Sequence, residues 1–180
     1  GDTWVKNGTI AITSSLGLVM GDVYLGDHEN TSLNGSGNTQ GILQADADID
    51  FTNSIQSIFL NKGGGAINTN GYIVTLGENT IRDGIGGAAP NIGRDLHKTG
   101  AGVLTLLNNQ YYSGRTFIDQ GILRLDAVDP NTPLNNSKGL LNTPEVTVAA
   151  GSRLEGQGIV GNSINAQLGN TNAPTVSPTD

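Results

Sequence analysis

Three carboxylates on alternate residues form the pattern in this sequence that is best suited to chemistry. Asp46, Asp48 and Asp50 alternate with apolar residues throughout residues 43–51. Strict alternation predicts one half-buried strand, with the three carboxylates on one face and about 7 Å between neighbours. Calcium prefers oxygen ligands of this kind, but the glycine and glutamate of the calcium-loop pattern are missing at the required positions. We interpret the row as a solvated acidic face and keep a metal site as the alternative.

No other set of residues has the spacing of a known catalytic or cofactor site. The chain has no cysteine, and its two histidines, His28 and His97, have no partner at metal-binding spacing. No nucleophile elbow and no phosphate-binding glycine loop occurs. We therefore predict no catalytic residue, no cofactor and no enzymatic activity. The alternative is a β-helix polysaccharide lyase or hydrolase with carboxylates along an outer groove, for which only Arg115 and Arg124 fall near each other among the arginines.

Composition predicts a folded, acidic and turn-rich chain. Hydrophobic residues make up 36% of it and charged residues 14%, and 27 of its 180 residues are glycine, about twice the usual share of ~7%. The net charge of −7 argues against a phosphate-binding surface, so we expect no nucleic-acid partner. No run approaches the ~18 apolar residues of a membrane helix, so we expect no membrane insertion of this segment.

Short alternating runs separated by glycine predict stacked strands. Leu104 and Leu106 share one face of a strand, and the same Leu-x-Leu pattern returns 19 residues later. Residues 40–46 match residues 120–126 at five of seven positions, which we interpret as an echo four coils later. Apolar residues nowhere recur at helical spacing. The sequence therefore predicts an all-β parallel β-solenoid over residues 1–180, with short strands, irregular loops and little or no helix.

The alternation also predicts which side chains face the solenoid core. Thr105, Arg124, Glu145 and Thr147 should face water. The residues expected to line the interior are Leu104, Leu106, Leu123, Leu125, Val146 and Val148. We interpret Asn70-Gly71 as a solenoid corner rather than a hairpin turn, because the unequal run lengths around it do not suit pairwise strand matching.

Polar stretches mark the expected loops and ends. Residues 27–39 and 82–97 should form loops that carry a binding surface, and residues 129–137 are turn-forming. A further strand is predicted at residues 16–20. Residues 170–180 should be a frayed end or a cut through a longer solenoid.

Residues 98–125 resemble the passenger-associated transport repeat of bacterial autotransporters. The resemblance lies in the runs Lys-Thr-Gly-Ala-Gly-Val-Leu-Thr-Leu, Tyr-Ser-Gly-x-Thr and Gly-Ile-Leu-Arg-Leu. The matching positions are Lys98, Gly100, Gly102, Leu104, Leu106, Tyr112, Gly114, Thr116, Gly121, Leu123 and Leu125. Residues 64–72 and 150–158 also look like the passenger segments before and after such a repeat.

The resemblance implies a right-handed parallel β-helix that is exposed on the bacterial surface or released from it. It implies a signal peptide before this segment and an outer-membrane β-barrel after it in the full-length protein. Passengers of this family act mainly as stalks and adhesins, so the implied partners are a host-cell receptor, a matrix protein or a glycan. The repeat itself is implied to assist secretion and folding.

Overall fold

The computed structural model describes residues 1–15, 21–27, 40–52, 56–77, 80–84, 94–107, 109–126, 140–141, 143–160, 163–166 and 175–178. The predicted strand at residues 16–20 and the predicted turn segment at 129–137 lie outside this part of the chain. The same holds for residues 28–39 and 85–93 of the two predicted binding loops.

The described strands form three long stacks and a short fourth one. Sheet A contains β1 (Thr3–Val5), β3 (Val23–Leu25), β6 (Ile58–Leu60) and β9 (Ile81–Asp83). Sheet B contains β2 (Gly8–Ile12), β4 (Gly41–Ala45), β7 (Gly65–Asn68), β10 (Leu96–Thr99), β12 (Thr116–Ile118), β15 (Glu145–Val148) and β18 (Ser163–Ala166). Sheet C contains β5 (Ile49–Phe51), β8 (Ile73–Leu76), β11 (Val103–Leu107), β13 (Ile122–Asp126), β16 (Arg153–Gly156) and β19 (Thr175–Pro178). Sheet D pairs β14 (Leu140–Leu141) with β17 (Ile159–Val160).

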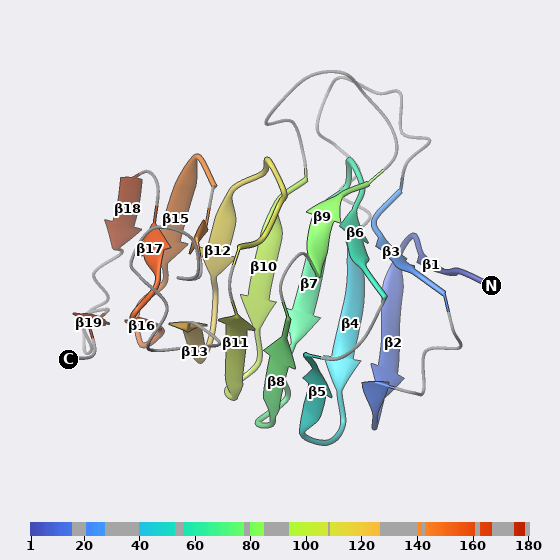
Figure 1. The fold of residues 1–180 in the computed structure, drawn as a ribbon, viewed down its shortest axis with the longest axis horizontal. Coiled ribbons are helices and arrows are strands. Elements are labelled where there is room, and N and C mark those ends of the chain that lie inside the picture. Colours follow the sequence, from blue (N-terminus) through green and yellow to red (C-terminus); the bar gives the residue numbers. More distant parts are fainter. Residues whose placement is uncertain are drawn as a thin grey trace.

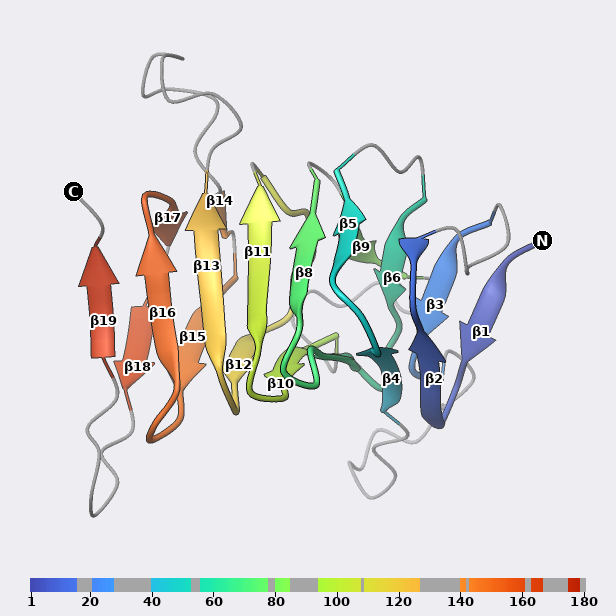
Figure 2. The ribbon, with the colours of Figure 1, turned by 90° about the horizontal axis from the view of Figure 1, so that it is seen from below.

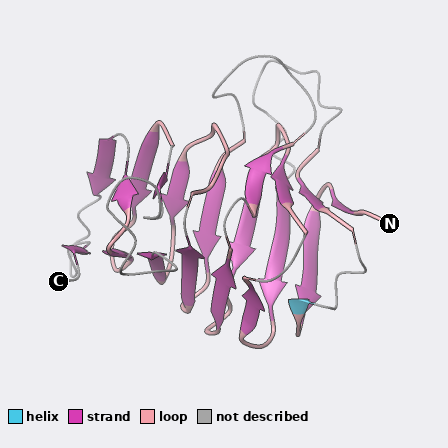
Figure 3. Cartoon of the chain, in the orientation of Figure 1, coloured by secondary structure: helices cyan, strands magenta, loops and turns pink. Residues whose placement is uncertain are grey.

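Up to β11 the chain winds through sheets A, B and C and returns to them one layer further along; from β12 onward the described strands lie in sheets B, C and D (Figures 1 and 2). Successive strands such as β6, β7 and β8 belong to sheets A, B and C, and every strand pair between layers is parallel. Each coil therefore buries its inner face only against its neighbours, as in a solenoid. Among the described residues, Ser15 alone is helical (Figure 3). The predicted parallel β-helix is confirmed.

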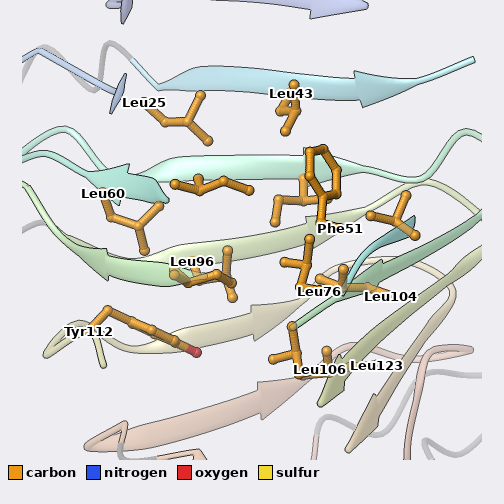
Figure 4. Close-up of a cluster of buried hydrophobic side chains, with 14 of the residues drawn as sticks. Leu25, Leu43, Phe51, Leu60, Leu76, Leu96, Leu104, Leu106, Tyr112 and Leu123 are labelled. Carbon is orange, nitrogen blue, oxygen red and sulfur yellow. The ribbon is translucent and has the colours of Figure 1, made fainter. Parts of the chain in front are cut away.

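Inward side chains of successive coils stack into one continuous apolar core (Figure 4). Leu104 pairs with Leu123 and Leu106 with Leu125, so the predicted spacing of 19 residues is a true coil repeat. All six residues predicted to line the interior are at most 2% exposed. Burying each of these side chains contributes about 1.5–3 kcal/mol, so the core is the main source of stability.

The predicted solvent face of the strands is only partly correct. Arg124 and Glu145 are partly exposed, but Thr105 is only 7% and Thr147 only 9% exposed. In the parallel register Thr105 lies between Thr75 and Arg124 of the adjacent coils. Because coils lie about 4.8 Å apart, side chains on an outward column cover their smaller neighbours, and a threonine there loses contact with water.

The predicted single strand over residues 43–51 is wrong. The chain turns at residues 46–48, so β4 lies in sheet B and β5 in sheet C. The echo between residues 40–46 and 120–126 is not a coil repeat either, because β4 and β13 lie in different sheets. A glycine followed by alternating apolar residues suits any face of the solenoid, so this pattern does not determine the register.

The Asn70-Gly71 dipeptide is a solenoid corner, as predicted. It connects β7 in sheet B to β8 in sheet C. Both residues have positive φ, 48° and 90°, and the Tyr72 amide donates to the Thr69 carbonyl at 2.7 Å.

Near the C-terminus, β19 lies within the predicted frayed stretch 170–180 and pairs with β16.

Candidate functional site

Lys98 is a buried lysine in the apolar core of the solenoid. Its position in β10 points inward together with Leu96, and both side chains are 0% exposed. In the parallel register it lies between Ile67 and Ile118, which occupy the same position in the adjacent coils. A lysine is almost never fully buried unless its amine is satisfied, so its partners define a site.

Four oxygen atoms surround the Lys98 amine. Nζ donates to the carbonyls of Thr99 at 2.9 Å, Gly100 at 2.7 Å and Gln120 at 2.9 Å, and to the Thr69 hydroxyl at 2.9 Å. These groups lie at the corner between sheets B and C in three consecutive coils. The Thr99 carbonyl also accepts from the Thr69 amide at 3.0 Å, and the Thr69 hydroxyl donates toward the Thr99 and Gly100 carbonyls at 3.2 and 3.3 Å. The Lys98 amine adds one donor group that all three corners share, and so it links them.

The backbone around this amine packs too closely for larger residues. Gly121 has φ of 77°, and a Cβ built on it would lie 2.5 Å from the carbonyl oxygens of Gly100 and Gly102. A Cβ on Gly100 or Gly102 would also collide, with Asn68 Oδ1 and the Tyr72 carbonyl respectively. These glycines therefore allow the corners to stack in register.

Two adjacent tyrosines of this coil differ in environment. Tyr111 is 54% exposed, whereas Tyr112 is 3% exposed and its hydroxyl lies 2.6 Å from Thr116 Oγ1. Burial raises the pKa of the Tyr112 phenol far above its ordinary value, because the charged form has little solvation in the core. Tyr112 therefore fills the core, and only Tyr111 is placed to contact a ligand such as a glycan.

One ion pair and one histidine–carboxylate hydrogen bond lie on the outer surface of the same coil. Arg115 Nη2 lies 2.9 Å from Asp95 Oδ2, and His97 Nδ1 lies 2.7 Å from Asp119 Oδ2. The His97 ring also stacks on Phe117 with centroids 4.6 Å apart. Arg115 and Asp119 are 51% and 43% exposed, whereas Asp95 and His97 are more covered, at 15% and 28%. Surface pairs of this kind contribute about 0–1 kcal/mol. The buried amine is therefore the stronger constraint on this coil.

The structure does not bring the acidic row together as a metal site. Asp46 accepts from Gln44 and Asn70, Asp48 from the Ile73 amide at 2.8 Å, and Asp50 from Thr52. The two hydrogen bonds from Thr52 lower the pKa of Asp50, so it stays negatively charged. Within the described ranges, no group of three His, Cys, Asp or Glu side chains is placed to hold a metal ion.

Sequence reasoning included Lys98 in the repeat but missed its burial. The alternation that puts Leu96 inside also puts Lys98 inside, and this is the signal that could have revealed it. It also missed Gln110, which is 2% exposed and bridges the Gly77 carbonyl at 2.8 Å and the Ile81 amide at 2.9 Å. Both side chains form hydrogen bonds with backbone groups at corners, and a pattern of apolar residues does not reveal such bonds.

The pKa of Lys98 predicts how stability depends on pH. Burial lowers this pKa from its ordinary value of 10.5 to about 8, although the Asp119 carboxylate opposes the shift. Between pH 8 and 10.5 the unfolded chain therefore binds more protons at this residue than the folded chain. The quantity to compare is the free energy of unfolding of the parent chain minus that of Lys98→Met. We expect this difference to be constant below pH 8 and to rise by up to ~1.4 kcal/mol per pH unit above pH 8.

Denaturant titrations of both proteins across this range measure the effect. Tyr112 acts in the opposite direction above pH 10, because its raised pKa keeps the folded phenol protonated while the unfolded phenol ionises. That contribution is common to both proteins and cancels in the difference. A difference that falls between pH 8 and 10 would contradict the lowered pKa of Lys98.

Comparison with known proteins places this coil in a family. A family model described as the passenger-associated-transport-repeat matches residues 96–125. The comparison with curated proteins found no match, and the comparison with solved structures found none either. Among the described residues, no helix is long and apolar enough to span a membrane. A repeat of this class implies secretion toward the cell surface. The match confirms the resemblance, and residues 96–125 of the chain carry the passenger-associated-transport-repeat.

Proposed function

We propose that this chain is a stalk segment that presents adhesive loops outside the cell, attached to the outer membrane or released from it. Its implied partners are a host-cell receptor, a matrix protein or a glycan, and in the full-length protein its own β-barrel. The observation that carries the proposal is the stack of parallel coils, because a continuous solenoid gives loops a stiff support. We propose no catalytic role.

Both predicted binding loops leave the solenoid from the same edge, between sheets A and B. The first begins after Gly26, whose amide donates to the Val5 carbonyl at 3.0 Å. The second begins after Gly84, whose amide donates to the Leu60 carbonyl at 2.8 Å. Asn61 occupies this edge in the coil between them and donates from Nδ2 to the Gly26 carbonyl at 3.0 Å. The two loop bases therefore lie close together along one edge, which supports a shared binding surface.

The base of the second loop is held by side chains on both of its arms. Asp83 Oδ2, where the chain leaves β9, lies 3.2 Å from Arg94 Nη1, where it returns toward β10. Asp83 Oδ1 also accepts from the Ser113 amide at 2.9 Å. The contact between Asp83 and Arg94 fixes the two points at which the chain leaves and rejoins the solenoid.

The Lys98 coil supports the proposed role of the repeat in secretion. Because one amine links three corners, this part of the solenoid should form as a single unit rather than coil by coil. A unit that folds cooperatively outside the membrane resists passage back through a pore. This is the physical basis on which we assign the repeat an assisting role in secretion and folding.

Replacing residues 28–39 and 85–93 with short Gly-Ser linkers tests the adhesive role. We expect binding to a panel of host cells, matrix proteins and glycans to fall to background, because the replacement removes the loops that carry the proposed binding surface and leaves only the stalk. The circular dichroism signal of the strands and the thermal midpoint should change little, since the loop bases stay in place.

The matched control is the same replacement at residues 129–137, which follow β13 in sheet C and not sheet A. That variant should keep the binding of the parent chain. Equal binding by the parent and the doubly replaced variant would contradict the proposal. Release of reducing or unsaturated sugars from a polysaccharide panel, with or without calcium, would contradict the non-catalytic role.

A further inference from the structure

Half of the aromatic residues of this chain lie in one outward column of sheet A. The chain has one tryptophan, four tyrosines and three phenylalanines. In register the column runs through Trp4 in β1, Tyr24 in β3, Phe59 in β6, Arg82 in β9 and, by an isolated bridge, Tyr111. We call its first three residues, Trp4, Tyr24 and Phe59, the aromatic column.

The three rings of the aromatic column stack on one another. The Trp4 and Tyr24 centroids are 4.1 Å apart with ring planes at 6°, and the Tyr24 and Phe59 centroids are 4.8 Å apart with ring planes at 11°. Because coils lie about 4.8 Å apart, each ring plane lies across the solenoid axis. Val23 and Leu25 on either side of Tyr24 belong to the core, so the rings point outward. Their faces meet between coils, and their edges form the outer surface of the column.

The edges of the aromatic column are available to a partner. Trp4 is 41% exposed and Phe59 is partly exposed, while Tyr24 between them is 9% exposed. A ring edge carries a partial positive charge and a ring face a partial negative charge, so aromatic groups favour contacts between an edge and a face. A flat aromatic molecule that lies lengthwise over the column presents its face to this row of edges.

Two carboxylates border the aromatic column, each directly before a strand of sheet A. Asp2 Oδ1 accepts from the Asp22 amide at 3.2 Å, and Asp22 Oδ1 accepts from the Ser57 amide at 2.9 Å. Each carboxylate is thus fixed on the next coil, and its Oδ2 atom accepts no hydrogen bond from the residues that the structure describes. Burial raises the pKa of the Tyr24 phenol, and the charges of Asp2 and Asp22 raise it further. Both charges therefore act on the aromatic column.

Positive charges lie on the other sides of the aromatic column. Lys6 and Lys62 follow β1 and β6, at the opposite end of these strands, and each has another interaction partner within the chain. Arg82 occupies the next position after Phe59 along the solenoid axis. The charge along the column thus changes from negative at its first two rings to positive beyond its third ring. A cation on the column is drawn toward the negative end.

We propose that the aromatic column binds an elongated planar aromatic cation. The molecule lies along the solenoid axis with its face over the three ring edges and its positive charge beside Asp2 and Asp22. Two coil steps of about 4.8 Å make the strip roughly 10 Å long, enough for two linked ring systems. The carboxylates repel an anionic molecule, and the row of ring edges favours a flat aromatic face over a branched aliphatic chain. The net charge of −7 adds a general attraction for cations.

Thioflavin T is a suitable probe, because it has two linked flat ring systems and one positive charge. An open strip covers less of a molecule than a pocket does, so we expect a Kd on the order of 10–100 µM at low ionic strength. Trp4 is the only tryptophan of the chain, so saturable quenching of its fluorescence reports binding at the aromatic column. The uncharged form of the dye, which lacks the N-methyl group, should bind the parent chain about 5–10-fold more weakly.

Two variants separate the charges from the rings. Asp2→Asn combined with Asp22→Asn removes both charges but keeps an Oδ1 acceptor for each amide, and it should weaken dye binding by about 5–10-fold. Phe59→Leu removes one ring from the column and should weaken binding by about 3–10-fold. The matched control is Phe117→Leu, the same substitution in the stacked pair of His97 and Phe117 on sheet B, which should leave the affinity unchanged.

Thermal midpoints show which variants are folded, and the comparison of the two dyes on the parent chain needs no variant. Several results would overturn the proposal: no saturable quenching of Trp4 in the parent chain, equal affinity for the charged and uncharged dyes, or unchanged affinity in the folded asparagine variant. An equal loss in folded Phe59→Leu and Phe117→Leu would also overturn it, because the dye would then bind stacked strands in general. The inference is independent of the adhesive loops, since no residue of the column belongs to them.

Discussion

Replacing Lys98 with methionine is expected to lower the free energy of unfolding by about 2–3 kcal/mol. The substitution removes the amine that donates to three corner carbonyls and the Thr69 hydroxyl. A buried carbonyl without a donor costs about 1–3 kcal/mol. Methionine cannot replace the amine at the Gln120 carbonyl, whereas the Thr99 and Gly100 carbonyls keep their hydrogen bonds from Thr69. The charged amine is itself costly to bury, as its lowered pKa shows. Lys98 therefore stabilises the coil through the groups that it satisfies, and chemical denaturation measures the loss.

Controls at neighbouring positions separate this effect from a change in core volume. Ile67→Met and Ile118→Met occupy the same core position in the adjacent coils and should cost less than ~1.5 kcal/mol each. Lys6→Met, at an exposed position, should change stability by less than ~0.5 kcal/mol. A loss below ~1 kcal/mol in Lys98→Met would show that the corner carbonyls find other donors and that the amine is not the link between coils.

The core of the solenoid could be predicted from the sequence because it depends only on local alternation. Leu104 and Leu123 each sit between outward residues, and side chains of a strand alternate whatever the strand pairs with. The 19-residue spacing of these leucines then predicted the length of one coil, and the pairing of Leu104 with Leu123 confirms it. The interior of every other coil follows the same rule, which is why the predicted core residues are buried.

Coil boundaries and register could not be predicted because coils of this solenoid differ in length. In sheet B, Gly41 pairs with Gly65, and Gly65 pairs with Leu96. Equal coils of about twenty residues would not give these pairs. The variation arises between strands, where the chain can lengthen without disturbing the stack. A similarity such as that of residues 40–46 to 120–126 therefore says that both are strands after a glycine, and not that they share a sheet.

The candidate site was only partly predictable for a different reason. A lysine among polar residues normally faces water, and its burial here depends on carbonyls at Gly100 and Gln120 that only the stacked corners bring together. The acidic row shows the converse case. Asp46 and Asp48 were expected on one strand, but the corner between β4 and β5 uses them to satisfy groups of the next coil. In both cases contacts between coils decide the role of a charged residue.

Replacing Gly121 with alanine is expected to destabilise the chain by about 3 kcal/mol or more. Gly121 has φ of 77°, which costs an L-residue roughly 1–2 kcal/mol. In addition, the new methyl group would lie 2.5 Å from the carbonyl oxygens of Gly100 and Gly102. Both oxygens belong to backbone, so relief requires the coils to move apart at the corner that Lys98 links. Denaturant unfolding of the variant measures the combined cost.

Gly71→Ala isolates the contribution of the close contact. Gly71 lies at the same corner of an earlier coil with φ of 90°, but a Cβ built there has no atom within 4 Å. This variant should therefore cost only the backbone strain, about 1–2 kcal/mol, while Gly121→Ala costs clearly more. Equal losses would mean that the corners tolerate separation and that conformation alone selects glycine. A larger loss at Gly121 would instead show that the spacing between stacked corners is rigid, as expected if one buried amine holds three of them in place.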